Sequence, residues 1–166
     1  LGRQLAGSVG GAPIEDSLMR PSILALDLEG TLISNAVSQI SRPGLCHFLE
    51  LAQEQFDELV MFTTVDEGLV RRIAALLVRE GVTPPWFSEL RYITWAGPTK
   101  DLTYACPVVG QALLLDDHGP YVHPGQEHLW VEIRQFGSPY LATDDGLVDA
   151  IKHLGEQISI LRPGAP

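Results

Sequence analysis

The sequence predicts a three-layer α/β sandwich with a mostly parallel, Rossmann-like sheet and no sizeable cap domain. Short apolar runs alternate along the chain with segments that have helical periodicity. The apolar runs lack the two-residue alternation of half-exposed strands, as expected for strands that are covered on both faces. The connections between these segments are short, which leaves little room for a separate lid. This alternation favours a parallel sheet with helices on both faces.

Five apolar segments are expected to form the strands. The first, SILALDL, suits a central strand that is buried on both faces. The others are ELVMFTT, RYITW, ALLLDD and LWVEI. In chain order, the five segments cover residues 22–28, 58–64, 91–95, 112–117 and 129–133.

Three segments with one apolar stripe each are expected to form the helices. The first covers residues 41–56, where Ser41 can cap the helix and Pro43 suits its first turn. The second covers residues 66–81 and ends at a glycine, the residue that commonly follows a helix. The third covers residues 144–158 and closes the ordered chain.

Length and composition fit one domain with a single core, because the chain has 166 residues of which 45% are hydrophobic. Residues 1–21 are Gly-rich and contain proline, so we expect a flexible arm. The folded domain is expected to cover residues 22–160, followed by a short tail at 161–166. Cys46 and Cys106 have no metal-binding spacing, which favours two free thiols over a disulfide.

The net charge of −10 argues against a nucleic-acid partner, because phosphate backbones are bound by clustered Lys and Arg. No apolar run reaches the roughly 18 residues of a membrane-spanning helix. The beginning of the chain also lacks the long apolar stretch of a secretory signal. We therefore expect a cytoplasmic protein with no membrane contact. An acidic chain can still surround a site whose charge a bound cation offsets.

Polar side chains follow three of the predicted strands at the point where each strand ends. Because parallel strands end at the same edge of a sheet, these side chains can converge near the point where strand order reverses. Crowded carboxylates repel one another, and Mg²⁺ with its preference for oxygen ligands relieves that repulsion. The candidates are Asp27, Thr63, Thr64, Asp116 and Asp117, together with Lys100 from the connection before the fourth strand.

These residue types suit phosphoryl transfer. A carboxylate can attack phosphorus and form an aspartyl-phosphate. A hydroxyl and a lysine can hold the phosphoryl oxygens and offset the charge that develops on them. A second carboxyl group beside the nucleophile can protonate the leaving alcohol and later activate water.

The segments DLEGTL, FTT, KDL and LLLDD resemble, in order, the four motifs of the haloacid dehalogenase (HAD) superfamily. The closer resemblance is to its FCP/SCP-type branch, also called NLI-interacting-factor-like, whose members dephosphorylate proteins such as the RNA polymerase II tail. It rests on RPGLCHFL, VMFTT, TKDL and LLLDDHGPYVHPGQ and covers about residues 22–158. The resemblance implies a HAD-like fold and a Mg²⁺-dependent phosphatase.

The same resemblance implies a role for each candidate. Asp27 would be the nucleophile and a metal ligand, and Lys100 would pair with Asp27 and the phosphate. Thr63 would bind the phosphoryl group. Its neighbour Thr64 is a second candidate substrate contact, although a role at the strand end is the simpler interpretation.

The remaining implied roles concern the metal and the proton. Asp116 would complete the metal site, with Asp117 as a second or water-mediated ligand. Glu29 would give its backbone carbonyl to Mg²⁺ and its side chain as general acid/base. The family has Asp at this position, so the acid/base carboxylate here is one methylene further from the backbone. Gly30 also stands where the closer branch usually has Glu.

Three functions compete at this point. The first is a Mg²⁺-dependent phosphomonoesterase with an aspartyl-phosphate intermediate, whose open site would suit a macromolecular substrate such as a phosphoprotein. The second is a catalytically weak binding module, which the substitution at Glu29 favours. The third is a phosphoryl-accepting receiver domain, and motif order argues against it, because a receiver has its acidic pair at the first strand. We expect the first function.

Overall fold

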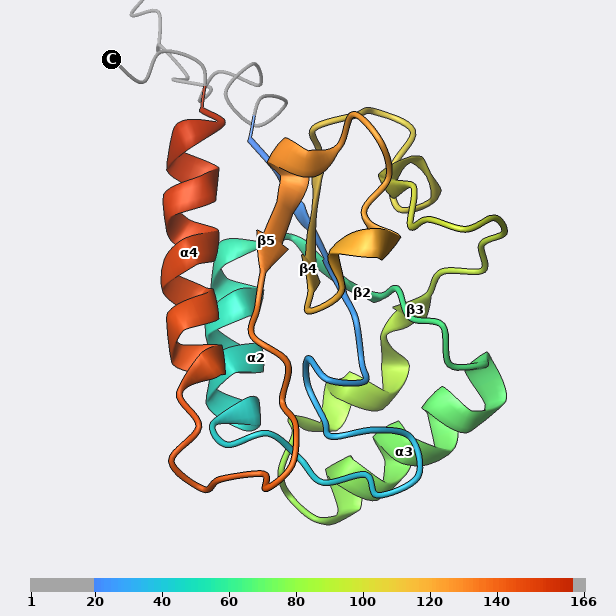
Figure 1. Cartoon of the computed structure of the whole chain (residues 1–166), viewed down its shortest axis with the longest axis vertical. Coiled ribbons are helices and arrows are strands. Elements are labelled where there is room, and N and C mark those ends of the chain that lie inside the picture. Colours follow the sequence, from blue (N-terminus) through green and yellow to red (C-terminus); the bar gives the residue numbers. More distant parts are fainter. Residues whose placement is uncertain (1–19, 163–166) are drawn as a thin grey trace, which may run out of the picture.

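The computed structural model describes residues 20–162 (Figure 1). The predicted arm at 1–21 and tail at 161–166 therefore lie mostly outside the described residues. Within the described part of the chain, no helix is long and apolar enough to cross a membrane. Both cysteines are free thiols, as predicted.

The predicted fold class is confirmed. Five strands form one open sheet in the order β3-β2-β1-β4-β5, and every neighbouring pair is parallel. Strand β1 lies at the centre, where Leu26 aligns with Met61 of β2 on one side and Leu115 of β4 on the other. The strands are β1 (Ile23–Leu26), β2 (Glu58–Met61), β3 (Arg91–Tyr92), β4 (Ala112–Asp116) and β5 (Trp130–Glu132).

Each observed strand is shorter than its predicted segment. The predicted segment continues past Leu26, the last residue of β1, but the chain leaves the sheet at Asp27, whose N–H still donates to the carbonyl of Leu115 at 3.0 Å. Edge strand β3 is reduced to two residues, and Ile93 beyond it keeps one hydrogen bond to Met61. Burial patterns alone do not reveal where the ladder of a neighbouring strand ends.

Within residues 20–162, three helices cover the sheet. Figure 1 shows α2 (Leu45–Gln55) and α4 (Gly146–Ile160) together on one face and α3 (Glu67–Arg79) on the other. The remaining short helical turns are η1 (Pro85–Glu89), η2 (Leu102–Tyr104), η3 (Gly119–Tyr121) and η4 (Glu127–Leu129). The core lies between the sheet and these helices, and Leu24, Ala25 and Leu26 of the central strand are fully buried.

Helix α3 begins at a side-chain cap. The side chain of Asp66 caps α3 by accepting a hydrogen bond from the N–H of Leu69 at 3.0 Å. The prediction that Ser41 caps α2 is wrong. Ser41 forms an isolated antiparallel bridge with Ile33, and α2 begins only after Gly44, which takes a left-handed conformation with φ of 78°. The loop between β1 and α2 is thereby held close to the end of β1.

Candidate functional site

Three carboxylates converge at the point where the strand order of the sheet reverses, between β1 and β4. Asp27 follows β1, Asp116 ends β4, and Asp117 comes next; each offers an oxygen within 4.8 Å of those of the other two. The convergence follows from topology, because β1 and β4 are parallel neighbours whose carboxyl ends meet at one edge. Asp27 and Asp116 are buried and Asp117 is half-buried.

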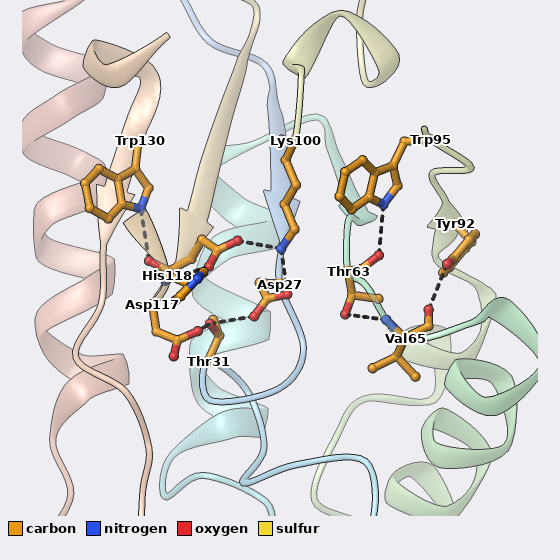
Figure 2. A network of polar contacts seen from close by, with 11 residues as sticks. Asp27, Thr31, Thr63, Val65, Tyr92, Trp95, Lys100, Asp117, His118 and Trp130 are labelled. Carbon is orange, nitrogen blue, oxygen red and sulfur yellow. Dashed lines mark hydrogen bonds and ion pairs between the residues drawn. The ribbon is translucent and has the colours of Figure 1, made fainter. Parts of the chain in front are cut away.

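Lys100 lies between two of these carboxylates (Figure 2). Its Nζ donates to Asp27 Oδ1 at 2.7 Å and to Asp116 Oδ2 at 2.5 Å, and its side chain is 0% exposed. The backbone fixes its position, since the N–H of Lys100 donates to the carbonyl of Tyr121 at 2.7 Å. One buried cation therefore serves a cluster of three acidic groups.

The charge of the cluster is only partly compensated. Burial and the negative charge of Asp27 raise the pKa of Asp116 to about 6, although Lys100 and the N–H of His118 act in the opposite direction. Burial and the charge of Asp27 also raise the pKa of Asp117. A second cation in this cluster would lower both pKa values. The donor set, three carboxylates with no sulfur or imidazole among them, fits a hard divalent cation that prefers oxygen. Asp27, Asp116 and Asp117 could therefore hold a metal ion.

Thr31 is a member of the site that the sequence did not single out. Its side chain is buried, and its hydroxyl lies 3.1 Å from Asp27 Oδ2 and 3.2 Å from Asp117 Oδ1 (Figure 2). The hydroxyl carries one proton and so shares it between two carboxylates. The only signal in the sequence is its place in DLEGTL, where the turn returns the chain toward Asp27.

Thr63 lies on the other flank of Asp27. It follows β2, the neighbour of β1 on the side opposite to β4, and Figure 2 shows it across Asp27 from Asp117. Its Oγ1 accepts a hydrogen bond from the N–H of Val65 at 3.3 Å, which leaves the hydroxyl proton free to donate. Its carbonyl accepts from Trp95 Nε1 at 2.9 Å. Thr64 is exposed.

The side chain of Glu29 is not among the acidic cluster. Its Oε1 accepts a hydrogen bond from the backbone N–H of Ala36 at 2.6 Å, in the loop that follows. The carboxylate of Glu29 therefore stabilises that loop. The structure brings together Asp27, Lys100, Asp116 and Asp117, as the sequence indicated, and leaves the proposed acid/base carboxylate elsewhere.

The turn after Asp27 depends on a glycine. Gly30 has φ of 74°, and a Cβ built on it would lie 2.5 Å from Asp117 Oδ2. Any side chain at this position would displace a carboxylate of the cluster. This close approach explains why a glycine stands at position 30.

A buried arginine stabilises the same turn by hydrogen bonds to its carbonyls. Arg42 Nη1 donates to the carbonyls of Gly30 at 3.4 Å and Thr31 at 3.2 Å. Its Nε and Nη2 donate to the Asp144 carboxylate at 2.6 and 3.2 Å, and Nη2 also donates to the carbonyl of Arg134 at 2.8 Å. The sequence placed Arg42 only within RPGLCHFL, and its spacing does not show that it reaches back to the turn.

A scan against models of protein families found no match for this sequence, and a search of curated proteins found none either.

Proposed function

We propose that this protein is a Mg²⁺-dependent phosphomonoesterase of HAD type. The observation that carries the proposal is Asp27, a buried carboxylate that contacts Lys100 and Thr31 and shares an incompletely compensated acidic cluster with Asp116 and Asp117. Such a site offers one nucleophilic carboxylate, one lysine and a set of oxygen ligands for a metal ion. This combination suits a phosphate ester, because the lysine and the metal ion can together neutralise the negative charge of the phosphoryl group.

In the first step, an oxygen of Asp27 forms a bond to phosphorus while the bond from phosphorus to the alcohol oxygen breaks. The alcohol oxygen leaves with the bonding electrons and takes a proton from water. Lys100 orients Asp27 through its hydrogen bond, and the free hydroxyl proton of Thr63 is available to a phosphoryl oxygen. Mg²⁺ held by Asp27, Asp116 and Asp117 would neutralise charge on the phosphoryl group.

In the second step, water attacks the phosphorus of the aspartyl-phosphate, inorganic phosphate leaves, and the Asp27 carboxylate is restored. Thr31 has a supporting role in both steps, since its hydroxyl contacts both Asp27 and Asp117 and so keeps the nucleophile and a metal ligand in register. A phosphorylated protein is the substrate that the resemblance favours.

Hydrolysis of p-nitrophenyl phosphate tests this function. Wild type is expected to release nitrophenol with Mg²⁺ and to lose this activity in EDTA. Asp27→Asn keeps the shape of the side chain but removes its nucleophilic charge, so turnover should fall at least about 10³-fold. An Asp27→Asn protein that is as active as wild type would refute the mechanism.

A catalytically weak binding module is the second candidate, and the position of Glu29 favours it. Its carboxylate is bonded to Ala36 instead of lying beside Asp27. A misplaced acid/base group costs on the order of 10²-fold in rate. Binding of Mg²⁺ and inorganic phosphate without turnover would support this candidate, and a gain of turnover in Glu29→Asp would identify the missing group.

A further inference from the structure

A cavity of about 340 Å³ lies on the Thr63 flank of the site. It is lined by the residues after β2 and around β3, namely Thr63, Thr64, Tyr92, Thr94, Trp95 and their neighbours Ala96 and Gly97. Strand order places it opposite the acidic cluster: from β4 to β3, the carboxyl ends of the strands carry Asp116, then Asp27, then Thr63, then Tyr92. Figure 2 shows Thr63 and Tyr92 on the far side of Asp27 from Asp117. Neighbouring strands lie about 5 Å apart, so the cavity begins one strand away from the nucleophile.

The lining of this cavity is uncharged and includes two aromatic rings, those of Tyr92 and Trp95. Among the residues that the structure describes, no Asp, Glu, Lys, Arg or His lines it. The polar atoms of its two rings are already used: Trp95 Nε1 donates to the carbonyl of Thr63, and the Tyr92 hydroxyl donates to the carbonyl of Val65 at 2.8 Å. What these residues can offer a ligand is ring surface, with the hydroxyls of Thr64 and Thr94 at the exposed rim.

The position of the Glu29 carboxylate also favours an aryl ligand, because it decides which leaving groups can depart without a proton donor. The leaving alcohol needs a proton unless it is itself a weak base, and the Glu29 carboxylate is held at the N–H of Ala36. A phenol has a pKa of about 10, far below that of an alkyl alcohol, so it can leave as phenolate and take a proton from water afterwards. An aryl ester therefore loses least from the position of Glu29.

We propose that the cavity lined by Trp95, Tyr92 and Thr63 binds the leaving group of the substrate, and that this group is an uncharged aryl ring. The inference rests on the proposed phosphatase function and narrows its substrate to aryl phosphates. Two sources offer that chemistry, a phosphotyrosine side chain in a protein and a free aryl phosphate. Aliphatic phosphate esters, including phosphoserine, would leave the cavity empty and need the proton donor that is not in place.

Binding of two phosphonates in the presence of Mg²⁺ tests the proposal without turnover. Phenylphosphonate and methylphosphonate carry the same charged group and differ in the ring. Isothermal titration calorimetry measures both affinities in wild type and in every variant, and the indole N–H resonance of Trp95 reports occupation of the cavity in wild type by NMR. We expect phenylphosphonate to bind at least about tenfold more tightly than methylphosphonate, since a ring buries far more apolar area than a methyl group. Equal affinities would overturn the proposal.

Two variants locate the preference. Trp95→Leu removes the ring, and Ala96→Gln fills the cavity from an exposed position without a charge. Both are expected to bring the affinity ratio close to one, and in Ala96→Gln, which keeps the hydrogen bond from Trp95 to the carbonyl of Thr63, the affinity for methylphosphonate should stay within about twofold. Trp86→Leu is the matched control, because Trp86 is also half-buried against the core but does not line the cavity. A preference that survives both cavity variants would overturn the proposal.

A titration with phenol separates this inference from the proposed function. If neither phosphonate binds but phenol still shifts the Trp95 resonance, the phosphate site is wrong and the cavity is an aryl site unconnected to it, which overturns the assignment as a leaving-group site. If phosphonates bind equally and phenol has no effect, only the cavity proposal falls. Comparison of kcat/KM for free phosphotyrosine, a phosphotyrosine peptide and a phosphoserine peptide then distinguishes the two aryl sources. Faster turnover of the phosphoserine peptide would refute the aryl preference.

Discussion

Replacing Arg42 with methionine is expected to destabilise the fold by about 3–5 kcal/mol, because the change leaves buried acceptors without their donor. The Arg42 side chain is 0% exposed and that of its partner Asp144 is 10% exposed. The substitution removes two hydrogen bonds to this carboxylate and those to the carbonyls of Gly30, Thr31 and Arg134. Buried charge-assisted bonds of this kind are the ones whose loss is costly.

Arg134 provides a matched control within the same cluster. Its Nη2 lies 3.8 Å from Asp144 Oδ2, but its side chain is 74% exposed. Exposed ion pairs contribute little, so Arg134→Met should change the free energy of unfolding by no more than about 1 kcal/mol. Arg42→Lys keeps the charge but loses the planar fork that serves several acceptors at once, and should fall between the two variants.

Urea unfolding followed by circular dichroism measures these differences, and its pH dependence tests their origin. Burial raises the pKa of Asp144, but hydrogen bonds from Arg42 and the N–H of Gly146, with the charges of Arg42 and Arg134, lower it by more. A folded-state pKa below the unfolded value contributes stability above the unfolded pKa, and that contribution is lost as the pH falls through the folded pKa. The difference in the free energy of unfolding between wild type and Arg42→Met should therefore become smaller below about pH 4. A gap at pH 7 no larger than that of Arg134→Met would refute the reasoning.

Two further predictions concern the proposed metal site. Gly30→Ala should weaken Mg²⁺ binding at least about tenfold by calorimetry, because the new Cβ would lie 2.5 Å from Asp117 Oδ2. Gly125→Ala also has positive φ, at 86°, but meets no atom within 4 Å, so it should cost only about 1–2 kcal/mol of stability and leave Mg²⁺ affinity unchanged; equal affinities of the two variants would contradict this role of Gly30. Mg²⁺ should bind about tenfold more weakly at pH 5 than at pH 7, because a carboxyl group with a pKa near 6, such as Asp116, must lose its proton to bind the ion. Calorimetry in two buffers of different ionisation enthalpy should show proton release at pH 5, and an affinity independent of pH would contradict the assignment of Asp116 as a ligand.

The sequence predicts the fold well because its strands are buried on both faces and end in polar residues. A parallel sheet with helices on both faces follows from that pattern, and so does the meeting of Asp27 with Asp116 and Asp117. The start of α2 was not predictable in the same way. Ser41 has the right chemistry for a cap, but it bridges to Ile33 because the preceding loop folds back on itself.

The contacts of Glu29 and Arg42 were not predicted, because they depend on where long side chains extend in the folded protein. Glu29 has the residue type and position of an acid/base group, yet its side chain extends to Ala36. Arg42 lies only 11 positions after Thr31, but its contact with the turn requires a guanidinium that also satisfies Asp144, more than a hundred positions further on. Such three-way contacts have no signature in local spacing or hydrophobic period.

The central claim is that Asp27 becomes phosphorylated, and mass spectrometry of acid-quenched protein tests it most directly. After brief incubation with Mg²⁺ and an aryl phosphate, wild type should gain one phosphoryl group on the peptide that contains Asp27. The position of Glu29 should favour its detection, since a misplaced base slows attack of water on the aspartyl-phosphate. The Asp27→Asn protein should gain none. Phosphate release by wild type with no mass gain on this peptide, or with a gain on another residue, would contradict the account.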